Sequence, residues 1–288
     1  MCAKVWSNHV AVGIAYSGYT PTFVRENPDV VDYVEVPFEL LRHDPSVIEI
    51  LTFKPIVLHC ASLSIAGMVL PTEKTVAAIQ HWVHRTQTPW LGEHLSFIAA
   101  DREQAGDFAD EYAPGEPYNI GYTVSPPTNE GSIQQVLRSI QFCEQHFDVP
   151  LLLENPPLYF ATPGSTMTQV EFINEISARS SVDLLLDLAH FYITSQTMGF
   201  DPLREITFLP LERVKEVHIS GVDVQSDSYW DNHANRAPEV EFELLGLVLE
   251  RAAVRGITLE YNWSAQFPAS VLLDEIARTR KVIARVED

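Results

Sequence analysis

The chain has 288 residues, of which 46% are hydrophobic and 20% charged, and its formal net charge is −20. This length suffices for a domain with a large core, and the negative charge disfavours binding to nucleic acid. The apolar runs are too short and too charged to cross a bilayer, and the first residues lack the apolar stretch of a secretory signal. Three scattered cysteines, Cys2, Cys60 and Cys143, form neither a disulfide framework nor a CxxC site. We therefore expect a cytoplasmic protein.

Short apolar runs recur along the whole chain, with amphipathic stretches of helical spacing between most of them. The runs are continuous rather than alternating, which is typical of parallel strands buried on both faces. Gly256 is predicted to end a helix just before the last strand. The predicted strands are 11–16, 32–36, 55–59, 91–97, 150–155, 182–188, 216–220 and 257–261, and the predicted helices are 72–86, 132–147, 168–180, 241–256 and 269–286.

Eight strands alternating with helices, in a chain of this length, predict a single (β/α)₈ TIM-barrel domain over residues 1–288. A doubly wound open sheet is the alternative. Two segments, at about 98–131 and 221–241, lack regular patterning and are predicted to be long loops on the functional face. The first is expected to form a lid or a partner surface.

Histidines and carboxylates stand at the ends of the predicted strands, one strand after another. In a TIM barrel these ends surround one cavity, and burying such groups costs several kcal/mol unless they are paired or bind a cation. Because the set exceeds what one ion needs and contains no thiolate, it predicts two or three ions of iron, manganese or catalytic zinc. Glu154 and Glu260 are the natural bridges. The candidate ligands are His59, His94, Glu154, Asp187, His190, His218, Asp231, His233 and Glu260.

Other polar residues beside the ligands have competing interpretations. His94 alone could be a hydrogen-bonded core histidine, and Asn155 either braces the following loop or touches the substrate. Glu35, Ser96 and Asn155 are predicted to orient the ligands or the substrate. Structural or surface roles are predicted for the remainder, namely Glu93, Cys60, His43, His81, His84 and His146.

The order of the candidate ligands resembles two groups built on barrels of the xylose-isomerase and endonuclease IV kind. The first is endonuclease IV, a trinuclear zinc phosphodiesterase. The second is closer in local sequence and comprises the multinuclear non-heme iron oxidative enzymes, with peptide-modifying relatives in methanobactin and thiaglutamate biosynthesis. Its similarity covers about residues 11–285, through DYVEVPFE, LHCASLSI, GEHLSF, LLLENPP, LLLDLAHF, EVHISG, DNHA and LEYNW. The endonuclease IV pattern implies three sites: His59, His94 and Glu154; Glu154, Asp187, His218 and Glu260; and His190, Asp231 and His233.

The second resemblance implies two or three irons of mixed Fe(II)/Fe(III) valence, with O₂ as co-substrate. It implies oxidation of a cysteine in a ribosomally synthesised precursor peptide and a small leader-recognition partner protein, hence a heterodimer. Excision of the cysteine β-carbon is favoured over oxazolone–thioamide formation, because LHCASLSI and GEHLSF are closer to the general family than to the methanobactin branch. His190 departs from the family pattern, since many members carry Asn there. The rivals are a zinc phosphodiesterase, a Mn²⁺-dependent sugar isomerase or epimerase, and a non-catalytic metal-dependent binding protein.

Overall fold

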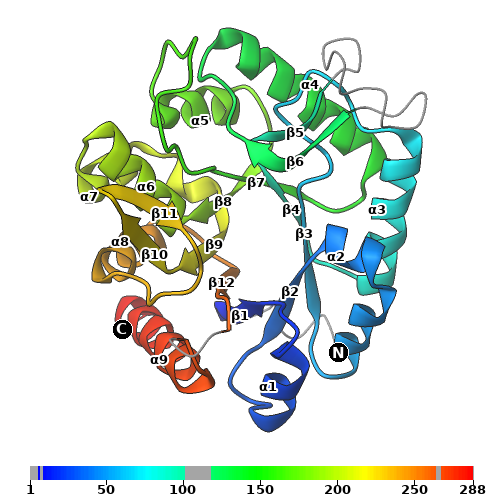
Figure 1. Cartoon of the computed structure of the whole chain (residues 1–288), viewed down its shortest axis with the longest axis vertical. Helices are drawn as coiled ribbons and strands as arrows, with labels where there is room; N and C mark the ends of the chain where they lie inside the picture. Colours follow the sequence, from blue (N-terminus) through cyan, green and yellow to red (C-terminus); the bar gives the residue numbers. More distant parts are fainter. Residues whose placement is uncertain (1–5, 7–8, 101–117, 264–266, 288) are drawn as a thin grey trace.

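A computed structural model describes residues 6, 9–100, 118–263 and 267–287. Strands occupy the centre of the molecule and helices surround them (Figure 1). Eight parallel strands close into a barrel in the order β1, β12, β9, β8, β7, β4, β3, β2. Because β1 pairs with both β12 and β2, the sheet has no open edge, and the predicted TIM barrel is confirmed against the doubly wound alternative.

Each of the eight predicted strands matches one barrel strand. Their buried Val, Ile and Leu side chains face either the barrel interior or the surrounding helices, which explains the continuous apolar runs. The strands are β1 (Ala11–Ala15), β2 (Tyr33–Pro37), β3 (Ile56–Cys60), β4 (Leu91–His94), β7 (Leu151–Glu154), β8 (Asp183–Asp187), β9 (Val214–Ser220) and β12 (Gly256–Glu260).

The five predicted helices are also present, and their starts follow local capping. Thr72 caps α3 by accepting from the Thr75 N–H, and Thr168 with Glu171 forms a capping box at α5. The shorter helices were not predicted. In chain order the helices are α1 (Thr20–Glu26), α2 (Phe38–His43), η2 (Pro45–Thr52), α3 (Glu73–Thr86), α4 (Glu130–His146), α5 (Gln169–Ala178), α6 (Leu188–Met198), α7 (Pro202–Glu205), η5 (Ile206–Phe208), η6 (Leu211–Arg213), α8 (Glu239–Leu249) and α9 (Ala269–Glu287).

Two antiparallel hairpins extend from the carboxyl ends of β4 and β9, where long loops were predicted. The first pairs β5 (Phe97–Ala100) with β6 (Tyr118–Val124); the predicted lid residues 101–117 between them lie outside the described residues. The second pairs β10 (Val222–Gln225) with β11 (Ser228–Asp231). Its two-residue turn has positive φ at both positions, 50° at Ser226 and 64° at Asp227, the conformation that suits a tight hairpin.

Aromatic side chains close the amino-terminal end of the barrel. Tyr33 and Trp90 are fully buried there, and Trp6 packs against both rings. Gly256 is the first residue of β12, so it does not end the preceding helix as predicted. A Cβ at this position would lie 2.9 Å from the Tyr33 hydroxyl oxygen, and a glycine avoids that contact. In the described part of the chain, no helix is long and apolar enough to cross a membrane.

Candidate metal centre

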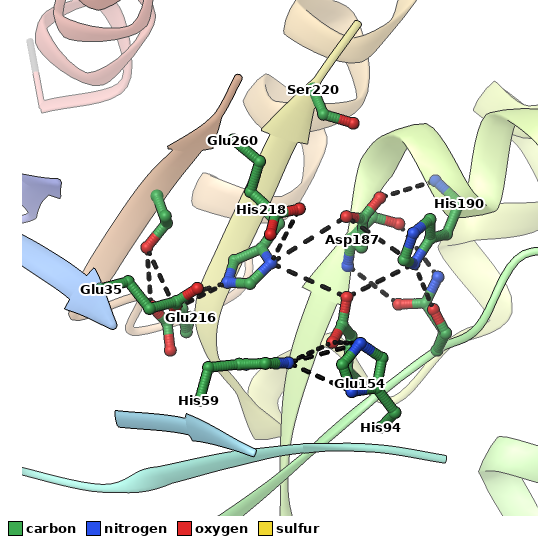
Figure 2. Close-up of polar contacts among 12 residues, drawn as sticks. Glu35, His59, His94, Glu154, Asp187, His190, Glu216, His218, Ser220 and Glu260 are labelled. Atoms are coloured by element: carbon green, nitrogen blue, oxygen red, sulfur yellow. Dashed lines mark hydrogen bonds and ion pairs between the residues drawn. The ribbon is translucent and has the colours of Figure 1, made fainter. Parts of the chain in front are cut away.

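The carboxyl ends of the barrel strands bring the predicted ligands into one network of contacts (Figure 2). In Figure 2, His218 lies at the middle, with Glu35 on one side and Glu154 and Asp187 on the other. The closed barrel accounts for this convergence, because neighbouring parallel strands end around one opening. Barrel strands carry His59 (β3), His94 (β4), Glu154 (β7), Asp187 (β8), His218 (β9) and Glu260 (β12), whereas His190 lies in α6, Asp231 ends β11 and His233 follows it.

The first group of donors meets at one oxygen of Glu154. The Nε2 atoms of His59 and His94 lie 3.1 and 3.4 Å from Glu154 Oε2. These three residues offer one donor atom each within a radius that suits a single ion. Gly92 makes room for the first imidazole, since a Cβ there would lie 2.6 Å from His59 Nδ1. This glycine is therefore required for the packing of the site.

The second group surrounds Nδ1 of His218. This nitrogen lies 3.7 Å from Glu154 Oε1, 4.0 Å from Asp187 Oδ2 and 3.4 Å from Glu260 Oε2. Among the described residues, His218 Nδ1, Asp187 Oδ2 and Glu154 Oε2 are buried atoms without a hydrogen-bond partner. Buried polar atoms are nearly always satisfied. His218 Nδ1 and Asp187 Oδ2, 4.0 Å apart, fit a cation in the second group, and Glu154 Oε2 fits a cation in the first group.

The third group meets at Asp231 Oδ2, which lies 3.2 Å from His190 Nε2 and 2.9 Å from His233 Nε2. His190 lies in the first turn of α6 because Asp187 caps that helix by accepting from the His190 N–H. Ser220 donates to the other oxygen of Asp231 at 3.1 Å and so orients the carboxylate. The sites implied by the endonuclease IV pattern therefore correspond to three spatial groups, while their occupation by metal stays a prediction.

Two of the histidines hold one ring nitrogen against a group other than the candidate ligands and direct the other nitrogen into the cluster. His218 Nε2 lies 3.0 Å from Glu35 Oε2, and His190 Nδ1 lies 2.9 Å from the Asn155 carbonyl. His94 Nδ1 lies between the Cys60 carbonyl, at 3.4 Å, and His59 Nε2, at 3.3 Å. Metal-binding histidines show this pattern, because the outer hydrogen bond sets the tautomer and the ring orientation. Glu35 occupies this outer position toward His218, and with His59 and His218 it also forms a further group of donor atoms within 4.8 Å of one another, so its role toward a metal stays a prediction.

Asn155 and Ser96 differ in how they meet the cluster. The Asn155 side chain accepts from the Asp187 N–H at 2.9 Å and donates to the Asp187 carbonyl at 3.0 Å, so it fixes the end of β8. Ser96 is buried two residues after His94, and its carbonyl accepts from the Ala66 N–H. That bond secures the loop after β3. A direct role of either residue toward a substrate stays a prediction.

Sequence reasoning missed a buried polar network beneath the cluster. Glu216 accepts from Thr258 Oγ1 at 2.9 Å, from the Tyr33 hydroxyl at 3.3 Å and from Trp90 Nε1. Thr258 also lies 3.4 Å from Glu35 Oε2, which connects this network to the outer partner of His218. The signal was present in the sequence, since Glu216 lies two residues before His218 and so shares its strand face.

Electrostatics in the metal-free cluster reflect crowded carboxylates. Burial raises the pKa of Asp187 to about 7. His190 opposes this shift, and the Glu260 carboxylate adds to it. Burial alone would lower the pKa of His59, but Glu154 outweighs it and raises the value to about 10. A bound cation would favour the carboxylate form of Asp187 and the neutral form of His59, so metal binding is expected to release protons.

The fold and the cluster define a class: a TIM-barrel protein with a candidate multinuclear centre of nitrogen and oxygen donors. The family profile described as RiPP precursor modification enzyme MbnB/TglH/ChrH matches residues 11–284. RiPPs are ribosomally synthesised and post-translationally modified peptides. The chain belongs to this family, which acts on precursor peptides.

Curated relatives carry no assigned activity in their names. A UPF0276 protein of Shewanella sediminis is 26% identical over 260 residues, covering 88% of this chain and 87% of its own length. One from Anaeromyxobacter is 27% identical, covering 80% and 76%. One from Streptomyces avermitilis is 25% identical and is matched over 80% of this chain but 45% of its own length.

Solved structures of low sequence identity share the fold. Escherichia coli 3-keto-D-glucoside 4-epimerase is 17% identical with a TM-score of 0.57, covering 94% of this chain and 99% of its own. Endonuclease IV from Thermus thermophilus is 16% identical with a TM-score of 0.52, covering 96% and 98%. A xylose isomerase-like TIM barrel from Mycobacterium smegmatis, in complex with magnesium, has 12% identity and a TM-score of 0.56, covering 99% of both chains.

Proposed function

We propose that the protein is a multinuclear non-heme iron oxidoreductase that uses O₂ to modify a cysteine of a ribosomally synthesised precursor peptide. The observation that carries the metal part is that three atoms of the candidate ligands, His218 Nδ1, Asp187 Oδ2 and Glu154 Oε2, are among the buried atoms without a hydrogen-bond partner in the described part of the chain. The peptide part follows from family membership. Imidazole and carboxylate donors without a thiolate suit iron, which tolerates both.

Each group would hold an ion through its own donors, with Glu154 shared between the first and second groups and Glu260 between the second and third. Bound iron would supply one-electron redox chemistry for the reaction with O₂. Glu35 and the carbonyls of Cys60 and Asn155 would keep the imidazoles oriented. The protein thereby sets the cluster geometry before the substrate arrives.

The candidate ligands differ in exposure, which indicates where the peptide would approach. The side chains of His94 and His233 are 23% and 27% exposed, whereas His218 and Asp187 are 0% exposed. The cysteine thiol would therefore approach along the edge that carries His94 and His233. We propose that excision of the cysteine β-carbon is the outcome, and that a separate leader-binding protein delivers the peptide as part of a heterodimer.

The first experiment is metal analysis and Mössbauer spectroscopy on protein purified anaerobically. Two or three irons per chain, partly antiferromagnetically coupled, would support the proposal. Stoichiometric zinc that persists after expression in iron-rich medium would contradict it and favour phosphodiesterase chemistry, with abasic DNA as the next substrate. Stoichiometric Mn²⁺ would instead favour a sugar isomerase or epimerase. Metal binding without turnover of any peptide would favour a binding protein.

A further inference from the structure

Two exposed aromatic rings stack on each other beside the third group. Tyr159 follows β7 and Trp230 lies in β11, with their ring centroids 4.9 Å apart and their planes at 28°. Despite this contact, Tyr159 is 37% and Trp230 44% exposed, and the adjacent Phe160 is 64% exposed. Large apolar side chains gathered on a surface mark interaction sites.

The stack is continuous with the candidate metal centre. Trp230 directly precedes Asp231 in β11, and burial together with the nearby Asp231 carboxylate raises the pKa of Tyr159 to about 12. Both rings come from segments that follow the carboxyl ends of barrel strands, Tyr159 after β7 and Trp230 after β9. A molecule resting on the stack would therefore lie near Asp231 of the third group.

A carboxylate accompanies the rings. Asp223 is directly opposite Trp230 in the β10–β11 register, and opposed residues of an antiparallel pair project from the same face. Its oxygens accept from neutral donors, the Val224 N–H and Gln225 Nε2. An aromatic face next to a carboxylate attracts a cation, and a guanidinium can both stack on the ring and pair with the acid. The net charge of −20 favours the same kind of ligand.

We infer that Tyr159, Trp230 and Asp223 form a subsite for a basic side chain, preferably arginine, in the peptide segment next to the modified residue. This inference rests on the proposed function, because it assumes that the substrate is a peptide. The subsite would fix the register of the peptide, since a side chain held on the stack places its neighbours over the exposed edge of the cluster.

The test uses two synthetic peptides, acetyl-Gly₃-Arg-Gly₃-amide and the same peptide with Glu in place of Arg, titrated into the full-length protein as purified. The readout is tryptophan emission. We expect a saturable change with the Arg peptide alone, lost in Trp230→Leu and weakened about three- to fivefold in Asp223→Asn. Phe208→Leu is the control, because Phe208 is also exposed, at 54%, but lies in η5.

Three outcomes would overturn the subsite: equal responses to both peptides, an unchanged response in Trp230→Leu, or no response to either peptide at millimolar concentration. The measurement needs neither turnover nor iron. Binding of the Arg peptide by a protein that carries no iron would thus support the subsite and contradict the proposed function. Equal binding of both probes by an iron-containing protein that modifies a peptide would contradict only the subsite.

Discussion

The donors on the barrel strands and those on the hairpin side are held in different ways. Asp187 and His218 are fully buried at strand ends, where the register of parallel strands fixes them. Asp231 and His233 belong to the hairpin after β9, and their side chains are 15% and 27% exposed. The contrast suggests that the strand-borne groups form a permanent core and that the third group is the adjustable member.

Replacing the central strand-borne donor should have the largest effect. We expect His218→Ala to abolish activity with the fold intact, because it removes the one nitrogen that faces Glu154, Asp187 and Glu260. Turnover, metal content and circular dichroism measure this, with the exposed His43→Ala as control. Asp187→Ala should behave alike, although it also removes the cap of α6 at a cost of about 1 kcal/mol. Activity retained in either variant would refute the cluster.

Breaking the hairpin-side group should cost less. Asp231→Asn keeps an oxygen for Ser220 but removes the charge shared by His190 and His233. We expect one ion fewer per chain, with the other ions retained and activity reduced rather than abolished. Metal quantification after equilibrium dialysis tests this. Loss of every ion in Asp231→Asn would show that the three groups bind their ions as one unit. It would contradict the distinction between strand-borne and hairpin-side donors.

A glycine next to the first group offers a packing test. Gly92→Ala would place a methyl group 2.6 Å from His59 Nδ1, so we expect destabilisation of about 1–3 kcal/mol and weaker metal binding at the first group. Gly246→Ala in α8 is the matched control, since a Cβ there meets nothing within 4 Å and should stabilise the helix by about 0.5–1 kcal/mol. Urea unfolding measures both. Equal stabilities of the two variants would contradict the close approach.

The smallest effect concerns the metal-free protein and pH. Burial lowers the pKa values of His59 and His233, but Glu154 and Glu260 outweigh it and raise them to about 10 and 9. Their stabilisation is complete below the unfolded pKa of about 6.5 and is lost as pH rises through 9–10. Thermal stability should therefore fall across that window. NMR titration should show both imidazoles losing their protons well above pH 6.5. Metal-saturated protein should not show this loss, and metal-free stability that rises with pH would contradict the assignment.

Part of the site could be predicted because its signals are local. Apolar runs that end in His or a carboxylate are visible without knowledge of the fold, and the short sequence motifs that resemble the family are spread over nearly the whole barrel. The β10–β11 hairpin escaped prediction because its Ser226–Asp227 turn lacks the usual glycine. Glu216 and Ser220 escaped because their partners lie on other elements, and a polar residue within a strand does not reveal what it will contact.

By itself, the sequence determined the number of barrel strands, the type of donor at each strand end and the absence of thiolates among the candidate ligands. The sequence also predicted Glu154 as a bridge, but only the tertiary structure shows that one of its oxygens faces His59 and His94 and the other faces His218. Glu154 can reach both groups because β7 lies between β4 and β8 in the closed barrel. Glu35 meets His218 although β2 and β9 are not neighbours in the sheet. Such contacts arise across the barrel interior, and strand closure, which is a long-range property of the chain, is what creates that interior.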